Sequence, residues 1–438
     1  MIKYIFSFLV LLISSISAIS VVVPPVDPYA IYSPYNVVYY FQSPSQYYRI
    51  DYQWHLKNTG QPSITYYNNN YYSADAGGTV DTGYLDAKNL GLFPTNINRI
   101  RFAIIDSGIN SNHPDFNGLS FSGNTSDLSD ASGHGTCVGG VIFAKQNGIG
   151  VQGMLQNLSS VIIAKVTYRS TDEISTAIRW CVNQNARIIN LAWGTSENNA
   201  GLSNAVLFAK QNGAIIVCAA PDANQNVNTS PDYPSSWRFD NVISVTSITR
   251  TGTKYSPAAW GPTTVHLGAP GRVIVTTGLN PLYVYNSGTS MATPSVTSAL
   301  VLIANKYPYQ PYQYWIERLL VGVIPETDLG SNTISGGRLN LVSPLRDDSA
   351  KLTFSYNNQL QTMNITVVSG FNSGVYFLQS CTNLASPQHW DMVKLIGNNE
   401  SYGFHPDNPM MFFQVKLLDC YIPQAPQGKK PKLDIWCK

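Results

Sequence analysis

The sequence predicts an α/β fold with three layers, in which helices cover both faces of a mainly parallel sheet, followed by a small all-β C-terminal domain. The first prediction depends on short apolar runs that alternate with helix-length segments from residue 99 onward. It also depends on polar residues flanked by glycine where those runs end. The second depends on a switch to alternating apolar and polar residues after Pro344.

The predicted elements of the first domain follow one another in a regular order. Strands are expected over 100–105, 160–168, 187–193, 214–220 and 242–248, and helices over 135–146, 172–185, 202–211, 290–307 and 312–323. Parallel neighbours need right-handed crossovers, and helices of this length supply them. A domain spanning residues 51–345 is therefore predicted.

The C-terminal region, residues 350–438, is predicted to form a small β-sandwich. Alternating strands are expected over 351–355, 364–368, 375–378 and 412–417. The sequence does not indicate what this region does.

Composition limits the classes of function that the chain can have. The chain has 438 residues, 44% of them hydrophobic and 12% charged, so it can bury a large core divided over two or three domains. The formal net charge of +2 is too small to indicate a nucleic-acid-binding protein. The basic run Lys429-Lys430-Pro431-Lys432 is typical of a solvated terminus.

The N-terminus has the pattern of a secretory signal peptide over residues 1–20. Lys3 precedes an apolar run over 4–13, and Ala18 and Ser20 satisfy the small-residue cleavage pattern. Residues 21–50 then form a leader rich in Pro and Tyr, without a sustained helical or alternating pattern. Because no later apolar run has the roughly 18 residues that span a bilayer, we expect a lumenal, vesicular or extracellular protein without a transmembrane anchor.

Secretion agrees with the acceptor sequences for N-glycosylation and with the cysteine content. Sequons occur at Asn124, Asn157, Asn228, Asn364 and Asn399. Of the six cysteines, Cys137 and Cys218 lie in apolar runs and are expected to be buried thiols, whereas a disulfide is expected among Cys381, Cys420 and Cys437.

Three residues beside glycines form a candidate catalytic group. Asp106 ends the first strand, His134 stands in Gly133-His134-Gly135 ahead of a helix, and Ser290 follows Gly288-Thr289 at another helix start. Each alone is compatible with a turn or a helix cap. Together they supply what nucleophilic catalysis needs, because serine requires a neutral imidazole as base and the imidazole requires a carboxylate to orient it.

The motifs around these residues resemble the subtilisin-like serine proteases over roughly residues 50–345. The matching stretches are 103–109, 113–115, 133–136, 189–194, 269–271 and 288–294. The resemblance implies a serine endopeptidase with Asp106, His134 and Ser290 as its triad. Two features resemble the kexin-like branch, namely the stretch 51–60 and Trp193 before Gly194.

The sequence departs from the family pattern at the residue expected to bind the oxyanion. The resemblance implies an asparagine there, whereas Ala219-Ala220-Pro221 is followed by Asp222. A carboxylate repels a developing oxyanion, so Asp222 can donate only when protonated. We therefore expect a slow or acid-shifted enzyme, limited on the acid side by protonation of His134. In the alternative alignment, Asn224 or Asn226 supplies the amide.

The resemblance also implies a substrate pocket. Its walls would be Ala192, Trp193 and Gly194 on one side and Ala220 and Pro221 on the other, with backbones able to pair with an extended substrate. Asp232 would lie at the base and favour Arg or Lys at P1, or it is a turn residue between two prolines. Glu197-Asn198-Asn199 stands where kexin-like enzymes carry paired aspartates, which weakens a dibasic preference.

The second departure is the leader, because about 30 residues between signal and domain are too few for the folding prodomain usual in the family. The rival interpretation is therefore a silent subtilase-fold glycoprotein that acts in adhesion or surface binding. No metal ligands can be assigned and no cofactor is required, although the family often binds structural calcium. The expected partners are protein or peptide substrates, and a monomer is expected.

Overall fold

The computed structural model describes residues 53–58, 78–147, 150–279 and 282–346 in full, and further strands outside these ranges by their backbone. The chain divides into two units, Met1–Pro344 and Leu345–Lys438. The predicted signal peptide lies outside the described residues.

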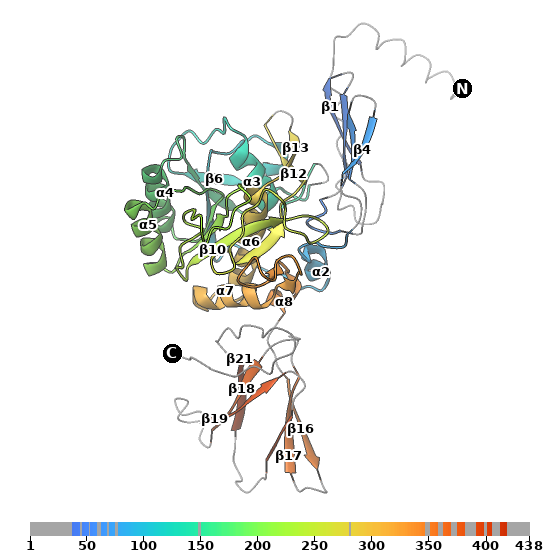
Figure 1. The fold of residues 1–438 in the computed structure, drawn as a ribbon, viewed down its shortest axis with the longest axis vertical. Coiled ribbons are helices and arrows are strands. Elements are labelled where there is room, and N and C mark those ends of the chain that lie inside the picture. The colour runs from blue at the N-terminus through green and yellow to red at the C-terminus, as the bar shows by residue number, and fades with distance from the viewer. Residues whose placement is uncertain are drawn as a thin grey trace, which may run out of the picture. The chain divides into compact units, whose positions relative to one another are not determined.

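A nine-stranded sheet forms the centre of the first unit, in the order β14-β15-β11-β10-β9-β8-β5-β7-β6 (Figure 1). Its neighbours pair in parallel except at the β14/β15 edge. The strands are β5 (Arg101–Asp106), β6 (Ser120–Gly123), β7 (Ser160–Lys165), β8 (Ala186–Leu191), β9 (Ile215–Ala219), β10 (Val242–Ile248), β11 (Leu267–Pro270), β14 (Ile324–Pro325) and β15 (Gly337–Arg338). The α/β class with a mainly parallel sheet is confirmed.

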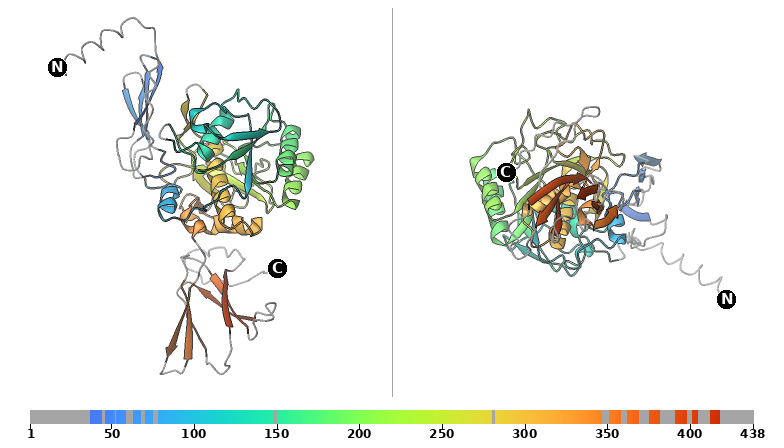
Figure 2. Two further views of the ribbon diagram at one scale, coloured as in Figure 1. Left: turned by 180° about the vertical axis from the view of Figure 1, so that it is seen from behind. Right: turned by 90° about the horizontal axis from the view of Figure 1, so that it is seen from below.

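Helices cover both faces of this sheet (Figures 1 and 2). On one face, α4 (Thr171–Asn183) and α5 (Ala200–Gln211) share an apolar core with β5, β7, β8 and β9. On the other, α3 (His134–Phe143) and α6 (Thr289–Lys306) pack together, and α6 contacts β8 to β11. Because both faces are covered, the inner strands are continuous apolar runs without alternation, as β10 shows with every residue buried.

The position of β5 in the sheet creates the site. This strand pairs with β8 on one side and β7 on the other, so the chain leaves β5 in one direction and later returns to its opposite edge. Such a reversal of strand order leaves a crevice at the carboxyl ends of the strands, where ligands bind in open α/β sheets. Asp106 is the last residue of β5.

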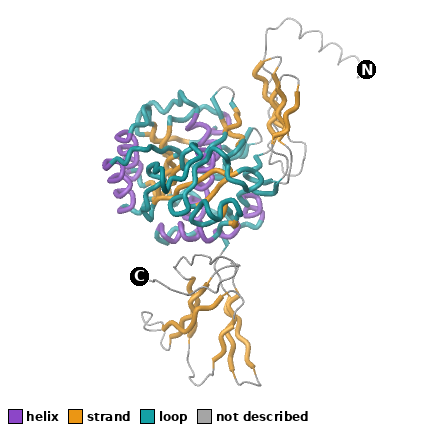
Figure 3. The backbone as a smooth tube through the Cα atoms, viewed as in Figure 1, coloured by secondary structure: helices purple, strands orange, loops and turns teal. Residues whose placement is uncertain are grey.

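Several short elements were not predicted. Among them are α2 (Tyr84–Asn89), the 3₁₀ turn η1 (Pro114–Phe116), α8 (Val342–Leu345) and β12 (Ile274–Thr277). β12 pairs antiparallel with β13 (Tyr283–Asn286), where the sequence has a β-like run over 283–285. The predicted helix α7 spans Tyr312–Val321. Figure 3 shows how much of the unit is loop between such elements.

Strands occur in the leader and just after it. β1 (Val37–Ser43) pairs antiparallel with β2 (Gln46–Asp51). Beyond the predicted leader, β3 (Ser63–Tyr67) pairs antiparallel with β4 (Asn70–Ala74). The reason is compositional, since Tyr and Val favour strands even where no strict alternation marks them. The predicted boundary at residue 50 therefore falls inside β2.

The second unit contains two three-stranded antiparallel sheets, β16-β17-β20 and β19-β18-β21. Their strands are β16 (Lys351–Asn357), β17 (Thr362–Val368), β18 (Val375–Cys381), β19 (Asp391–Gly397), β20 (Ser401–Phe404) and β21 (Phe412–Leu417). The packing of these sheets as a sandwich stays a prediction.

Within the described side chains, Cys137, Cys181 and Cys218 are free and buried. The expected disulfide among Cys381, Cys420 and Cys437 lies outside them. No helix in the described part of the chain is long and apolar enough to cross a membrane.

Candidate active site

Asp106 and His134 meet at the carboxyl end of the central strand. Asp106 is 2% exposed at the end of β5, and His134 is the first residue of α3. The His134 Nδ1 atom lies 2.8 Å from Asp106 Oδ1 and 3.0 Å from Oδ2. This pairing fixes the ring orientation and leaves Nε2 available as a base.

A second carboxylate, which the sequence analysis missed, holds this pair in place. Asp130 is buried and accepts hydrogen bonds from the amides of Gly133 and Thr136 at the start of α3, at 2.8 Å each. Its Oδ1 also accepts from the Ser107 hydroxyl at 2.8 Å, and that hydroxyl accepts from the Gly135 amide. Burial opposes the charge of Asp130, but these hydrogen bonds lower its pKa. Asp130 therefore joins the end of β5 to the start of α3.

The electrostatic surroundings of His134 favour its charged form. Burial acts to lower the pKa of the imidazole, but the Asp106 carboxylate outweighs burial, and the pKa is raised above the ordinary value. Asp130 raises it further, whereas the positive charge of Arg169 lowers it. A base with a raised pKa loses activity at a higher pH on acidification than a free imidazole would.

Ser290 lies at the start of α6, where the helix dipole favours negative charge. The preceding Gly288 has φ +144°, and a Cβ there would lie 2.6 Å from Asp222 Oδ2, so only glycine fits. Among the described residues, no hydrogen bond joins the Ser290 hydroxyl to His134. Catalytic hydrogen bonds of this kind commonly shorten only when substrate binds.

Asp222 contacts the same helix start. Its carboxylate accepts from the Thr289 amide, at 3.0 Å to Oδ1 and 3.3 Å to Oδ2. The side chain is exposed at the pocket mouth, yet neighbouring protein removes part of its hydration and raises its pKa, against the Thr289 amide and the charge of His134. Asn224 and Asn226 instead bond Lys254 and Asn228 and do not line the pocket.

A pocket of about 410 Å³ brings most of the predicted residues together. Its described lining comprises Arg169, Ala192, Trp193, Gly194, Ala219, Ala220, Pro221, Asp222, Asp232, Thr289 and Ser290. Every residue predicted for the substrate pocket is among them. The last residue of β9 and the loops that follow β8 and β9 thus supply the walls, and α6 supplies the serine.

Asp232 is both a pocket residue and a turn residue. Its backbone carbonyl accepts from Ser235 and Ser236, as in a turn, while its carboxylate packs against Gly194 in the pocket. Burial raises its pKa to about 6, and the Ser235 hydroxyl partly opposes this shift. The two interpretations drawn from the sequence are therefore compatible.

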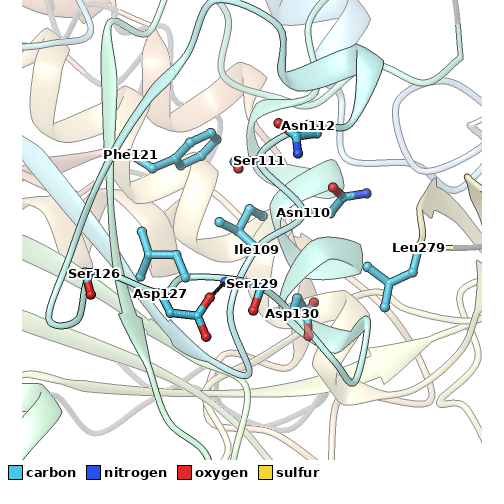
Figure 4. A pocket seen from close by; sticks show the side chains of 11 residues that line it. Ile109, Asn110, Ser111, Asn112, Phe121, Ser126, Asp127, Ser129, Asp130 and Leu279 are labelled. Atoms are coloured by element: carbon cyan, nitrogen blue, oxygen red, sulfur yellow. Dashed lines mark hydrogen bonds between the residues drawn. The ribbon is translucent and has the colours of Figure 1, made fainter.

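A larger cavity of about 660 Å³ lies beside the loop after β5 (Figure 4). It is lined by Ile109, Asn110, Ser111, Asn112, Phe121, Leu279 and the stretch 126–130. Asp106, His134 and Ser290 do not line it. Although this cavity is larger, Ser290 lines the smaller pocket, and His134 lies near enough for its charge to act on Asp222 in that lining. We therefore assign the candidate site to the smaller pocket.

Arg169 is the other residue that the sequence analysis missed. It lines the pocket, and its Nη2 atom donates to the Ala192 carbonyl at 3.2 Å. Its only signal in the sequence is indirect, since Ser170 and Glu173 form a capping pattern that places a helix start directly after it. Nothing in that pattern shows where the guanidinium lies.

No group of three or more His, Cys, Asp and Glu side chains that could hold a metal occurs in the described part of the chain. The expectation of structural calcium stays a prediction.

A model of the subtilase family matches residues 98–335, which is more than half of the chain. The chain belongs to the subtilase family of serine endopeptidases. It is 35% identical to the thermostable alkaline protease of Halalkalibacterium halodurans, over 51% of this chain and 60% of that protein. It is 34% identical to thermitase of Thermoactinomyces vulgaris, over 47% of this chain and 75% of thermitase.

The same fold occurs in the epidermin leader peptide processing serine protease of Staphylococcus aureus. That structure superposes on this chain with a TM-score of 0.51 at 24% identity. The match covers 59% of this chain and 77% of the Staphylococcus aureus chain. The subtilase fold predicted from the motifs is thus confirmed, whereas the kexin-like features stay a prediction.

Proposed function

We propose that this subtilase hydrolyses peptide bonds through an acyl-enzyme formed on Ser290. His134 accepts the serine proton and later gives it to the leaving amine, and Asp106 orients the imidazole and stabilises its cation. The observation that carries the proposal is the Asp106–His134 hydrogen bond of 2.8 Å beside the pocket that Ser290 lines.

The oxyanion is proposed to be bound by the Ser290 amide and by protonated Asp222. An ionised Asp222 would repel the oxyanion by roughly 5 kcal/mol at about 3 Å with an effective dielectric near 20. Partial desolvation supports the neutral form, since it raises the Asp222 pKa. Catalysis then needs Asp222 protonated and His134 neutral at once, and these requirements oppose each other in pH. We therefore propose a slow enzyme with a narrow, acid-shifted pH profile.

The pocket is proposed to accept Arg or Lys at P1. The supporting observation is the Asp232 carboxylate beside Gly194, which a basic side chain entering the pocket could pair with. The proposed preference weakens on acidification, because the pKa of Asp232 is raised to about 6.

The protein is proposed to be secreted or vesicular after removal of residues 1–20, and to act as a monomer on peptide or protein substrates. The second unit is proposed to be a sandwich that stabilises the catalytic unit or binds a partner. The signal-peptide pattern supports secretion, and the alternating residues after Pro344 support the sandwich.

Covalent labelling by a fluorophosphonate probe tests the proposed activity. We expect labelling of the wild type and none of Ser290→Ala, with correct folding of both checked by circular dichroism. A folded wild type that takes no label would instead favour the silent surface glycoprotein, for which the Asp222 substitution is the main argument.

A further inference from the structure

The loop that carries Arg169 is held in an unusual conformation by one carboxylate. The amides of Thr167, Tyr168 and Arg169 all donate to the Glu173 side chain, at 2.6, 2.8 and 2.7 Å. Arg169 has φ +55°, a left-handed conformation that is strained for a residue with a side chain of this size. The loop is thus fixed in place, and the direction of the Arg169 side chain with it.

The Arg169 guanidinium lies between Ala192 in the pocket wall and the catalytic base His134. It donates to the Ala192 carbonyl, and its charge acts on His134. Among the described residues that line the pocket, Arg169 has the basic side chain, and Asp222 and Asp232 have the acidic side chains. A guanidinium has five N–H donors, and the structure gives one side-chain hydrogen bond to this half-buried residue within the described part of the chain.

The bond to Ala192 has a consequence for substrate binding, which rests on the proposed function. An extended substrate that pairs with the backbone of Ala192 to Gly194 needs the Ala192 carbonyl as an acceptor. The Ala192 carbonyl oxygen has two lone pairs, so Arg169 can keep this bond while its remaining N–H donors lie beside the substrate backbone and require an acceptor in a partly desolvated site. A substrate carboxylate is the acceptor that matches a guanidinium best.

The charges of the pocket decide which substrate residue carries that carboxylate. An acidic P1 side chain would enter the pocket toward Asp232 and be repelled. The next side chain of an extended strand, P2, points away from the pocket base. We take the Arg169 guanidinium to face that side chain, because it bonds the Ala192 carbonyl and its charge acts on His134, which does not line the pocket. We propose that Arg169 is a specificity-determining residue that selects Asp or Glu at P2.

Binding of uncleaved peptides to Ser290→Ala tests this proposal without any turnover. Two fluorescent peptides would differ only in Glu or Gln at P2, both with Arg at P1, and their dissociation constants would be measured by fluorescence anisotropy. We expect the Glu peptide to bind about fivefold tighter at low salt, less so at high salt. The preference should disappear in Ser290→Ala/Arg169→Gln and shrink in Ser290→Ala/Arg169→Lys, which keeps the charge but not the fork.

Arg179→Gln in the same background is the matched control, because it removes an equal charge from α4, where Arg179 stacks over Phe208 at 5.1 Å. This control should keep the preference. Equal binding of the two peptides, absence of binding by both, or a preference that survives Arg169→Gln would overturn the proposal. A P2 preference in a protein that takes no fluorophosphonate would refute the proposed catalysis but not the role of Arg169.

Discussion

In the proposed mechanism, two residues at the active site must hold opposite protonation states for turnover. His134 must be neutral, and Asp106 raises its pKa, so acidification below that raised value removes the base. Asp222 must be protonated to donate, and although its pKa is raised, the carboxyl ionises as the pH increases. If the proposed mechanism holds, the productive form is a minor species on both sides of a narrow optimum, and we expect Asp222 rather than the triad to limit the rate.

Replacing Asp222 with Asn should raise kcat/KM by about a hundredfold, because an amide donates at every pH and removes the repulsion. The alkaline decline due to Asp222 should disappear, while the acid limb set by His134 should remain. Steady-state rates over a range of pH would show both effects. Asp232→Asn, which removes the other pocket carboxylate, is the control and should change only the P1 preference. Unchanged rate and pH profile in Asp222→Asn would contradict the proposed role.

Replacing Asp106 with Asn should lower kcat by about 10⁴-fold, because the imidazole loses both its orientation and the stabilisation of its cation. The pKa of His134 should fall, since the carboxylate is what raises it. NMR titration of His134 in the variant and in the wild type would measure this shift directly. A His134 pKa that stays raised in the variant would show that another group holds the charge.

At the scale of elements, the start of α6 combines helix geometry with catalysis. Gly288 permits the positive φ that turns the chain into the helix, and its missing side chain leaves space for Asp222 against the Thr289 amide. The helix thus presents its first amides and Ser290 to the pocket. Gly288 therefore both permits the turn into the helix and determines how closely the Asp222 carboxylate can approach the helix start.

Gly288→Ala should lower both activity and stability. The backbone strain costs about 1–3 kcal/mol, and the added Cβ displaces Asp222 from Thr289. Gly91→Ala is a matched control, because Gly91 also has positive φ, +66°, but a Cβ there meets no atom within 4 Å. Thermal melting should show a decrease for both variants, while peptidase assays should show a loss only for Gly288→Ala. Full activity in Gly288→Ala would mean that Asp222 need not lie against α6.

For the whole molecule, buried histidines limit stability in acid. His55 and His266 are enclosed, and burial lowers their pKa values to about 3 and about 4 from 6.5. Neither ring nitrogen of His55 has a hydrogen-bond partner among the described residues, and His266 Nδ1 accepts from the Ser244 amide. Because the unfolded chain binds protons more readily, stability is complete above pH 6.5 and falls as the pH decreases toward the folded pKa values.

We expect each histidine to cost about 2 kcal/mol of unfolding free energy at about pH 5, given 1.36 kcal/mol for each pKa unit. His55→Leu loses no hydrogen bond at the ring. The variant should therefore lose less unfolding free energy on acidification, by that amount. Urea denaturation between about pH 5 and pH 7.5 would measure it. Equal slopes for the variant and the wild type would show that His55 is not buried in the neutral form.

Much of the fold could be predicted because its signals are local. The strand 242–248 was predicted with the observed bounds, and the helices of the sheet layers within a few residues, since apolar runs of that length carry their own signal. The predicted helix to residue 146 ends at Phe143, where the backbone of Ala144 becomes extended. The two-residue strands β14 and β15 were missed because so short a run has no period.

By itself, the sequence determined the family, the parallel sheet and the candidate residues Asp106, His134 and Ser290, because glycine-flanked motifs and buried strands are properties of short stretches. Only the tertiary structure decided that Asp130 joins β5 to α3, that Asp222 lies against Thr289 and that Arg169 reaches Ala192. Those contacts join residues 67 and 23 positions apart in the last two cases. The charges of Asp130, Asp222 and Arg169 act through space. The order of strands in the sheet therefore determines which charges meet at the pocket, and no local sequence pattern contains that order.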